Sequence, residues 1–132
     1  MIELLVVIAI IGILATIVLI NLNTARNKAK DAAIKGALSE ARAAAEMWYD
    51  DHAMSYATFC TDATSEYLTR LKPSIDGNSG SAHCFANANT YCVESSLVTP
   101  SPAEYWCVDS DGISKNVGTT AKCAAAGNKC TP

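Results

Sequence analysis

The hydrophobic residues of this chain follow two different patterns, one before and one after Ile20. From Leu4 to Ile20 the sequence carries no charge, and only Gly12 and Thr16 interrupt the apolar side chains. As a helix, this run of 17 residues would be about 25 Å long, which is just enough to cross a membrane. A helix that is apolar on every side must be covered on every side, and the rest of the chain is too short to bury it. The run also lacks the flanking basic stretch and small-residue cleavage site of a secretory signal peptide, so we predict a membrane-spanning helix.

After the apolar run the pattern becomes that of an amphipathic helix. Apolar residues recur at steps of three and four from Ile34 to Trp48, and charged residues lie between them. Alanine is frequent and no proline occurs before Pro73, so one helix is predicted from the N-terminus to about residue 53. The weaker helix formers at Asn21–Thr24 predict a bend or a frayed turn where the chain leaves the membrane.

The remaining sequence predicts an irregular segment followed by a small antiparallel sheet. A short helix is expected at Ser65–Leu71, ended by Pro73. Asp111-Gly112 is typical of a hairpin turn. Segments rich in β-branched and aromatic residues predict strands at Thr90–Val98, Glu104–Ser110 and Ile113–Val117, with Ala82–Ala86 as a candidate fourth.

Together these elements predict an α+β fold, a long N-terminal helix packed on a small antiparallel sheet. Residues 1–24 would be a hydrophobic helix that anchors the chain in a membrane, and residues 25–132 the globular domain. Within the domain we expect an amphipathic helix half at 25–53, a connecting loop at 54–81, the sheet at 82–117 and a cysteine-tethered tail at 118–132. Tyr91 and Val93 share one face of their strand, which should pack on the helix. Trp48 and Trp106 are expected to lie between helix and sheet.

All six cysteines follow the apolar run, at Cys60, Cys84, Cys92, Cys107, Cys123 and Cys130. An even number in a short, loop-rich region is typical of disulfides and of an oxidising compartment. Their spacing is unlike that of a zinc site, and the only histidines are His52 and His83. The preferred pairing is Cys60–Cys84, Cys92–Cys107 across a hairpin and Cys123–Cys130 in the tail, with Cys107–Cys123 as an alternative.

Charge and motifs argue against several classes of function. The net charge is −3, with no basic field for nucleic acid. No phosphate loop, nucleotide fingerprint or hydrolase elbow occurs, and the two histidines lack a nucleophile and acid in a recognisable order. Asp109, Asp111 and Gly112 are similar to a fragment of a calcium loop, but we favour a hairpin turn. We therefore expect no catalytic residue, cofactor, metal or nucleic-acid site.

Glu3 is the residue that does not fit a simple anchor. An ionised carboxylate at bilayer depth is costly without a partner, and we expect none within the chain. One interpretation is that Glu3 marks the headgroup level, where charges at helix ends cost little. The other is that helices stack side by side with an axial stagger, so that Glu3 forms an ion pair with the terminal amine of a neighbouring chain.

The segment Ile2–Ala15, followed by a long amphipathic helix, a sheet and a cysteine-tethered end, resembles type IV pilins and the related pseudopilins of type II secretion. The resemblance in sequence extends to about Lys30. Glu3 matches the family's glutamate, Met1 then supplies the terminal amine, and Gly12 matches a glycine where pilin helices loosen in filaments. In that family a prepilin peptidase removes a short basic leader, and the new N-terminal residue is methylated.

The sequence departs from the family pattern near its start. Glu3 follows Met1 by two residues, where the family has four. A start of the form Phe-Thr-Leu-Ile-Glu would give this sequence if an internal leucine codon were read as Met1, so we expect the natural start two residues upstream. Ile20 lies near the position of a helix-bending proline in many members, so any loosening after Gly12 should be shorter.

The resemblance implies a structural role. The chain would be a major pilin that crosses the inner membrane once, then joins identical subunits in an extracellular helical filament, with the help of the pilus assembly machinery. Such filaments serve adhesion, twitching motility or DNA uptake. The nearest alternative is a pseudopilin of a type II secretion system, and a more distant one is a single-pass anchored, disulfide-rich binding module.

Overall fold

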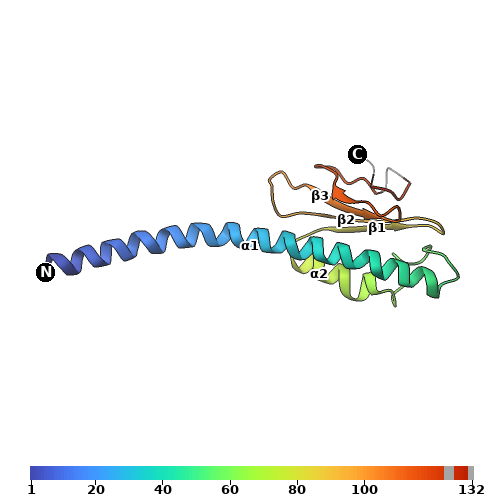
Figure 1. Cartoon of the computed structure of the whole chain (residues 1–132), viewed down its shortest axis with the longest axis horizontal. Coiled ribbons are helices and arrows are strands. Elements are labelled where there is room, and N and C mark those ends of the chain that lie inside the picture. Colours follow the sequence, from blue (N-terminus) through green and yellow to red (C-terminus); the bar gives the residue numbers. More distant parts are fainter. Residues whose placement is uncertain (124–126, 131–132) are drawn as a thin grey trace.

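The computed structural model describes residues 1–123 and 127–130. The expected α+β fold is confirmed: one long N-terminal helix packs on an antiparallel sheet (Figure 1). Parts of the predicted tail, residues 124–126 and 131–132, lie outside the described residues. The elements are α1 (Ile2–Asp51), η1 (Tyr67–Leu71), α2 (Lys72–Gly77), β1 (Ala82–Ala86), β2 (Tyr91–Ser96), β3 (Tyr105–Asp109) and β4 (Ser114–Asn116).

Helix α1 is continuous over 50 residues and ends at Asp51, close to the predicted end. Its first half projects from the rest of the molecule, and its second half lies along the sheet (Figure 1). The bend or frayed turn expected at Asn21–Thr24 is not seen, because α1 passes through this segment without interruption. The reason is that weak helix formers cost only about 0.5 kcal/mol each, which is too little to end a helix that continues with Ala25 and Arg26, both strong helix formers.

The sheet has the order β1-β2-β3-β4, with every neighbouring pair antiparallel. Its inner face packs on α1, as expected from the sequence. Tyr91, Val93 and Val108 on this face are buried against the helix stripe. The buried positions of the stripe are Ile34, Ala37, Leu38, Ala41, Ala44, Ala45 and Trp48.

Trp106 lies between helix and sheet as expected but is less buried, and Pro73 differs from expectation. Trp106 is only half-buried at the rim of the core, where the Lys35 ammonium lies 4.5 Å from the centre of its ring. Its strand places it on the inner face, but near one end of the sheet where solvent reaches it. Pro73 starts a helix instead of ending one, since it lies in the first turn of α2. Proline is tolerated there because N–H groups of the first turn have no partner within the helix.

The outer face of the sheet carries a second apolar layer. The chain after β4 folds back over this face, so that Cys123 and Cys130 are buried together with Cys92, Cys107 and Val117. Antiparallel sheets often leave one face to solvent, and the polar sequence after Gly118 predicts only a tethered tail. The disulfides are the physical reason for this second layer, because they replace the larger side chains that a core usually needs.

Candidate functional site

The apolar half of α1 is the largest exposed feature of the molecule. Its large apolar side chains, from Ile2 to Leu22, are each between 41 % and 77 % exposed. An 18-residue window of this helix has a mean hydropathy of 3.0, and none of it is buried. Soluble monomers rarely expose a contiguous apolar patch of more than a few hundred Å². By length and composition α1 can cross a membrane, and its apolar side chains require either lipid or other protein around them.

Glu3, Met1 and Gly12 lie along this exposed half. The Glu3 carboxylate lies 4.0 Å from the chain's own terminal amine, and both groups are fully exposed. The expectation that Glu3 has no partner within the chain was therefore wrong, although 4.0 Å is the outer limit of an ion pair and an exposed pair contributes little. At Gly12 the helix is intact, and the Thr16 hydroxyl donates to the Gly12 carbonyl oxygen at 2.9 Å.

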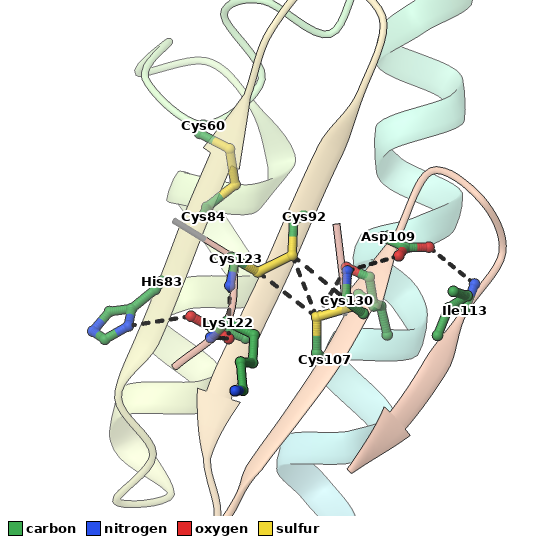
Figure 2. The surroundings of a disulfide bond; sticks show 12 residues. Cys60, His83, Cys84, Cys92, Cys107, Asp109, Ile113, Lys122, Cys123 and Cys130 are labelled. Carbon is green, nitrogen blue, oxygen red and sulfur yellow. Dashed lines mark hydrogen bonds and ion pairs between the residues drawn. A yellow bond between two sulfur atoms is a disulfide. The ribbon is translucent and has the colours of Figure 1, made fainter. Parts of the chain in front are cut away.

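All six cysteines form disulfides, as expected, but only one predicted pair is correct. Cys60–Cys84 is confirmed and joins the segment after α1 to β1. The pairs Cys92–Cys107, Cys123–Cys130 and the alternative Cys107–Cys123 are wrong. The remaining bonds are Cys92–Cys123 and Cys107–Cys130, which join β2 and β3 to the chain that follows β4 (Figure 2).

The register of β2 and β3 explains the wrong pairs. Cys92 lies opposite Asp109, and Cys107 lies opposite Glu94. The two cysteines share a face, as predicted, but they are diagonal neighbours and not opposite each other. Their sulfur atoms are nevertheless 3.3 Å apart, because both disulfides pack together in the second apolar layer.

The same three-residue pattern occurs on both strands. Cys-Val-Glu at 92–94 and Cys-Val-Asp at 107–109 each place the valine on the inner face and the cysteine and acid on the outer face. Antiparallel pairing then sets each cysteine opposite the acid of the other strand. The outer face therefore presents two buried carboxylates and two sulfur atoms to the chain that covers it.

Each strand binds one tail cysteine twice, through a disulfide and through a carboxylate. Glu94 Oε2 accepts hydrogen bonds from the backbone N–H of Lys122 at 2.8 Å and of Cys123 at 3.3 Å. Asp109 Oδ2 accepts one from the N–H of Cys130 at 2.9 Å. Cys123 is bonded to Cys92 of the Glu94 strand, and Cys130 to Cys107 of the Asp109 strand (Figure 2). We call this arrangement of two disulfides and two carboxylates the tail clamp.

The other oxygens of the two acids have different surroundings. Glu94 Oε1 is buried and accepts no hydrogen bond from the described residues, and the half-exposed His83 lies beside it, with Nδ1 at 3.8 Å. Asp109 Oδ1 accepts from the N–H groups of Asp111 and Ile113, both at 3.0 Å. Figure 2 shows His83 and Ile113 on opposite sides of the tail clamp.

The turn after β3 is the predicted hairpin turn. Gly112 has φ of 81°, a conformation that favours glycine, and it lies between β3 and β4. Both oxygens of Asp109 are taken by backbone N–H groups, and Asp111 forms an ion pair with Lys129 at 2.7 Å. These carboxylates thus hold the turn and the tail.

The sulfur atoms of the tail clamp lie close enough to hold a metal ion, but disulfide bonding removes that ability. One group consists of the sulfur atoms of Cys92, Cys107 and Cys130, which lie within 4.8 Å of one another. A second group, equally close, consists of the sulfur atoms of Cys107 and Cys123 and a carboxylate oxygen of Glu94. Metals bind the thiolate form of cysteine, which a disulfide does not provide. In the oxidised chain these groups therefore act as cross-links.

Asp31 is a third buried carboxylate and lies on the core side of α1. It is 6 % exposed and accepts hydrogen bonds from the N–H of Val98 at 2.6 Å, from the N–H of Thr99 at 3.1 Å and from the Thr99 hydroxyl. It thereby fixes the loop between β2 and β3 to the start of the packed half of α1. The sequence analysis missed Asp31, although it lies three residues before Ile34 and so continues the line of the apolar stripe.

Replacing Asp31 with alanine should lower the free energy of unfolding of the domain by about 2–3 kcal/mol, because two backbone N–H groups lose a charged acceptor. Asp31→Asn, which keeps one acceptor oxygen, should lose less. Urea unfolding measures both. The control is Asp76→Ala, which breaks the exposed Lys72–Asp76 ion pair of 2.5 Å and should cost less than about 1 kcal/mol. Equal losses for Asp31→Ala and Asp76→Ala would show that Asp31 does not fasten the loop.

His52 and His83 are explained by packing and charge. The His52 ring stacks on Trp48, with 3.6 Å between ring centroids, and its Nδ1 lies 3.0 Å from the Trp48 carbonyl oxygen. His83 lies beside Glu94, as described above. Sequence reasoning also missed Glu94, although the repeated Cys-Val-acid pattern was visible in the sequence.

The chain was compared with known proteins at three levels. Comparisons with protein-family models, with curated proteins and with solved structures found no significant match. The function is therefore inferred from three features of the chain itself: the exposed apolar half of α1 with Glu3 at its start, the packed half with its sheet, and the tail clamp.

Proposed function

We propose that this chain is a structural subunit that anchors in a membrane through residues 1–24 and polymerises through the same helix into an extracellular filament of the type IV pilus kind. The observation that carries the proposal is one uninterrupted helix with two uses. Its second half is the core of a folded domain, and its first half is apolar on all sides, fully exposed and begins with a carboxylate.

The continuity of α1 supports polymerisation over simple anchoring. A membrane anchor needs no rigid connection to its domain, whereas a subunit that stacks through its helix needs the domain held at a fixed position along that helix. Here the stripe from Ile34 to Trp48 fixes the domain to α1. An isolated anchor, such as that of a single-pass binding module, also gains nothing from Glu3.

The disulfides support an extracellular location. Each of the six cysteines is oxidised, and all lie beyond the apolar half. Disulfides persist in oxidising compartments and stabilise small domains that cannot build a large core. The periplasm is oxidising too, so the disulfides also fit a periplasmic pseudopilus; the surface pilus is favoured because no chaperone can refold a subunit outside the cell, where such stabilisation matters most.

A chain that begins at Asn23 should be a soluble, folded monomer, because it lacks the exposed apolar run but keeps the helix stripe that the sheet covers. The full chain should instead require detergent or membrane and should form filaments in its native host. Analytical ultracentrifugation and cooperative urea unfolding test the short chain, and electron microscopy of sheared surface filaments tests the full one. Aggregation of the short chain, or surface filaments whose density does not fit this sequence, would contradict the proposal.

A further inference from the structure

The side of α1 that faces neither the sheet nor the η1–α2 segment is exposed along the whole domain, and we call it the outward side. Positions at steps of three and four share this side, and all of them are exposed. We call this set the outward face, and it consists of Lys28, Ala32, Gly36, Ser39, Ala43, Met47 and Asp50. Its middle carries small side chains, so another helix can approach it closely.

The two ends of the domain half of α1 carry opposite charges, with Lys28 and Asp50 on the outward face and Arg26 and Asp51 on another side of the helix. Arg26 and Lys28 are exposed at the end next to the apolar run, and no ion pair to either is found among residues 1–123 and 127–130. Asp50 and Asp51 are exposed at the other end and likewise have no ion-pair partner in the described part of the chain. We call these residue pairs the basic end and the acidic end.

We propose that the outward face docks a second copy of this chain, displaced along the helix axis so that the acidic end of one copy meets the basic end of the next. Lys28 and Asp50, the charged residues of the outward face, are 22 residues apart in the sequence. At helical rise this separation corresponds to a displacement of about 33 Å. The inference rests on the proposed filament and adds the register of one of its contacts.

The same displacement also covers the apolar run. In this register, residues near Leu4 of one copy lie level with residues near Arg26 of the other, and residues near Ile20 lie level with Arg42. The exposed apolar side chains of one copy thus run beside the small residues of the outward face of the next. This one register therefore pairs the opposite charges of the two ends and also buries apolar surface. A contact between the basic end and lipid headgroups would not do both.

Charge reversal in the full chain, in its native host, tests the register. One variant carries Arg26→Glu and Lys28→Glu, a second carries Asp50→Lys and Asp51→Lys, and a third carries all four changes. Lys115→Glu, on β4 and away from α1, is the control. The measurements are the yield of sheared filaments and the amount of chain in the membrane fraction, with wild type and Glu3→Leu measured alongside.

Each reversal of one end should lower filament yield about tenfold at an unchanged amount in the membrane, the change that about 1.4 kcal/mol per interface produces. The variant with all four charge reversals should recover most of the filament yield, and the Lys115→Glu control should match wild type. Wild-type yield from both single-end variants, or no recovery on combining them, would overturn the register while leaving the proposed filament intact. Loss from the membrane fraction on reversing the basic end would assign those residues to anionic lipid instead. Absence of filaments from wild type would overturn the proposed function itself, and the register with it.

Discussion

Replacing Cys107 and Cys130 together with serine should lower the free energy of unfolding of the domain by about 4–5 kcal/mol, which is most of the stability of a small domain. The two cysteines are 23 residues apart, and the loss of loop closure alone accounts for about 3 kcal/mol. The rest comes from placing two hydroxyl groups in the second apolar layer, where both positions are buried. Urea unfolding of the chain from Asn23 to Pro132 measures the loss.

The matched control for this disulfide is Cys60–Cys84, whose cysteines are 24 residues apart, so that the closed loop is almost the same. Cys60 and Cys84 are only half-buried and lie outside the tail clamp. Replacing both with serine should therefore cost about 3 kcal/mol, the loop term alone. If the two double variants lose equal stability, the tail clamp adds nothing beyond loop closure.

Local patterns in the sequence predicted most of the fold. The stripe from Ile34 to Trp48, the alternation around Tyr91 and Val93, and the Asp111-Gly112 turn each depend on neighbours a few residues away, and the structure confirms each. Pro73 was misjudged because a proline ends one helix and starts another by the same chemistry. Whether the residues after the proline continue as a helix decides between the two outcomes, and after Pro73 they continue as α2.

The disulfide pairing could not be predicted because it depends on register and on a segment far along the chain. A shift of two residues between β2 and β3 keeps Cys92 and Cys107 on the same face but replaces Cys107 by Asp109 as the partner opposite Cys92. Cys107 Sγ also lies 3.7 Å from Cys123 Sγ, so distance alone does not select the observed pairs. In the structure each tail cysteine is bonded to the strand whose carboxylate also accepts its backbone N–H, Cys123 to the strand of Glu94 and Cys130 to the strand of Asp109.

Glu3 itself was evident from the sequence, but its partner depends on assembly and is not determined by one chain. In the single chain the nearest cation is the chain's own amine at 4.0 Å, with both groups in full contact with solvent. Once the apolar half of α1 is surrounded by lipid or by other helices, water no longer screens this carboxylate. It then needs a cation at close range, which in the proposed filament would be the terminal amine of a neighbouring subunit.

Replacing Glu3 with leucine should therefore leave membrane insertion intact and prevent filament assembly. The change lengthens the apolar run, so insertion is not weakened, but a terminal amine loses its buried partner at every subunit contact. Breaking a buried ion pair costs about 3–5 kcal/mol, which lowers an association constant by about two to four orders of magnitude. Glu3→Gln, which keeps an acceptor but loses the charge, should assemble to an intermediate extent.

The measurement is the yield of sheared filaments beside the amount of chain in the membrane fraction. Thr16→Leu is the control for added apolarity, because it extends the same apolar surface without removing a charge and gives up only an exposed hydrogen bond to Gly12. It should assemble like wild type. If Glu3→Leu also assembles like wild type, Glu3 only marks the membrane surface and does not pair between subunits. If Glu3→Leu is missing from the membrane fraction as well, the carboxylate acts in insertion, and the pairing role is again refuted.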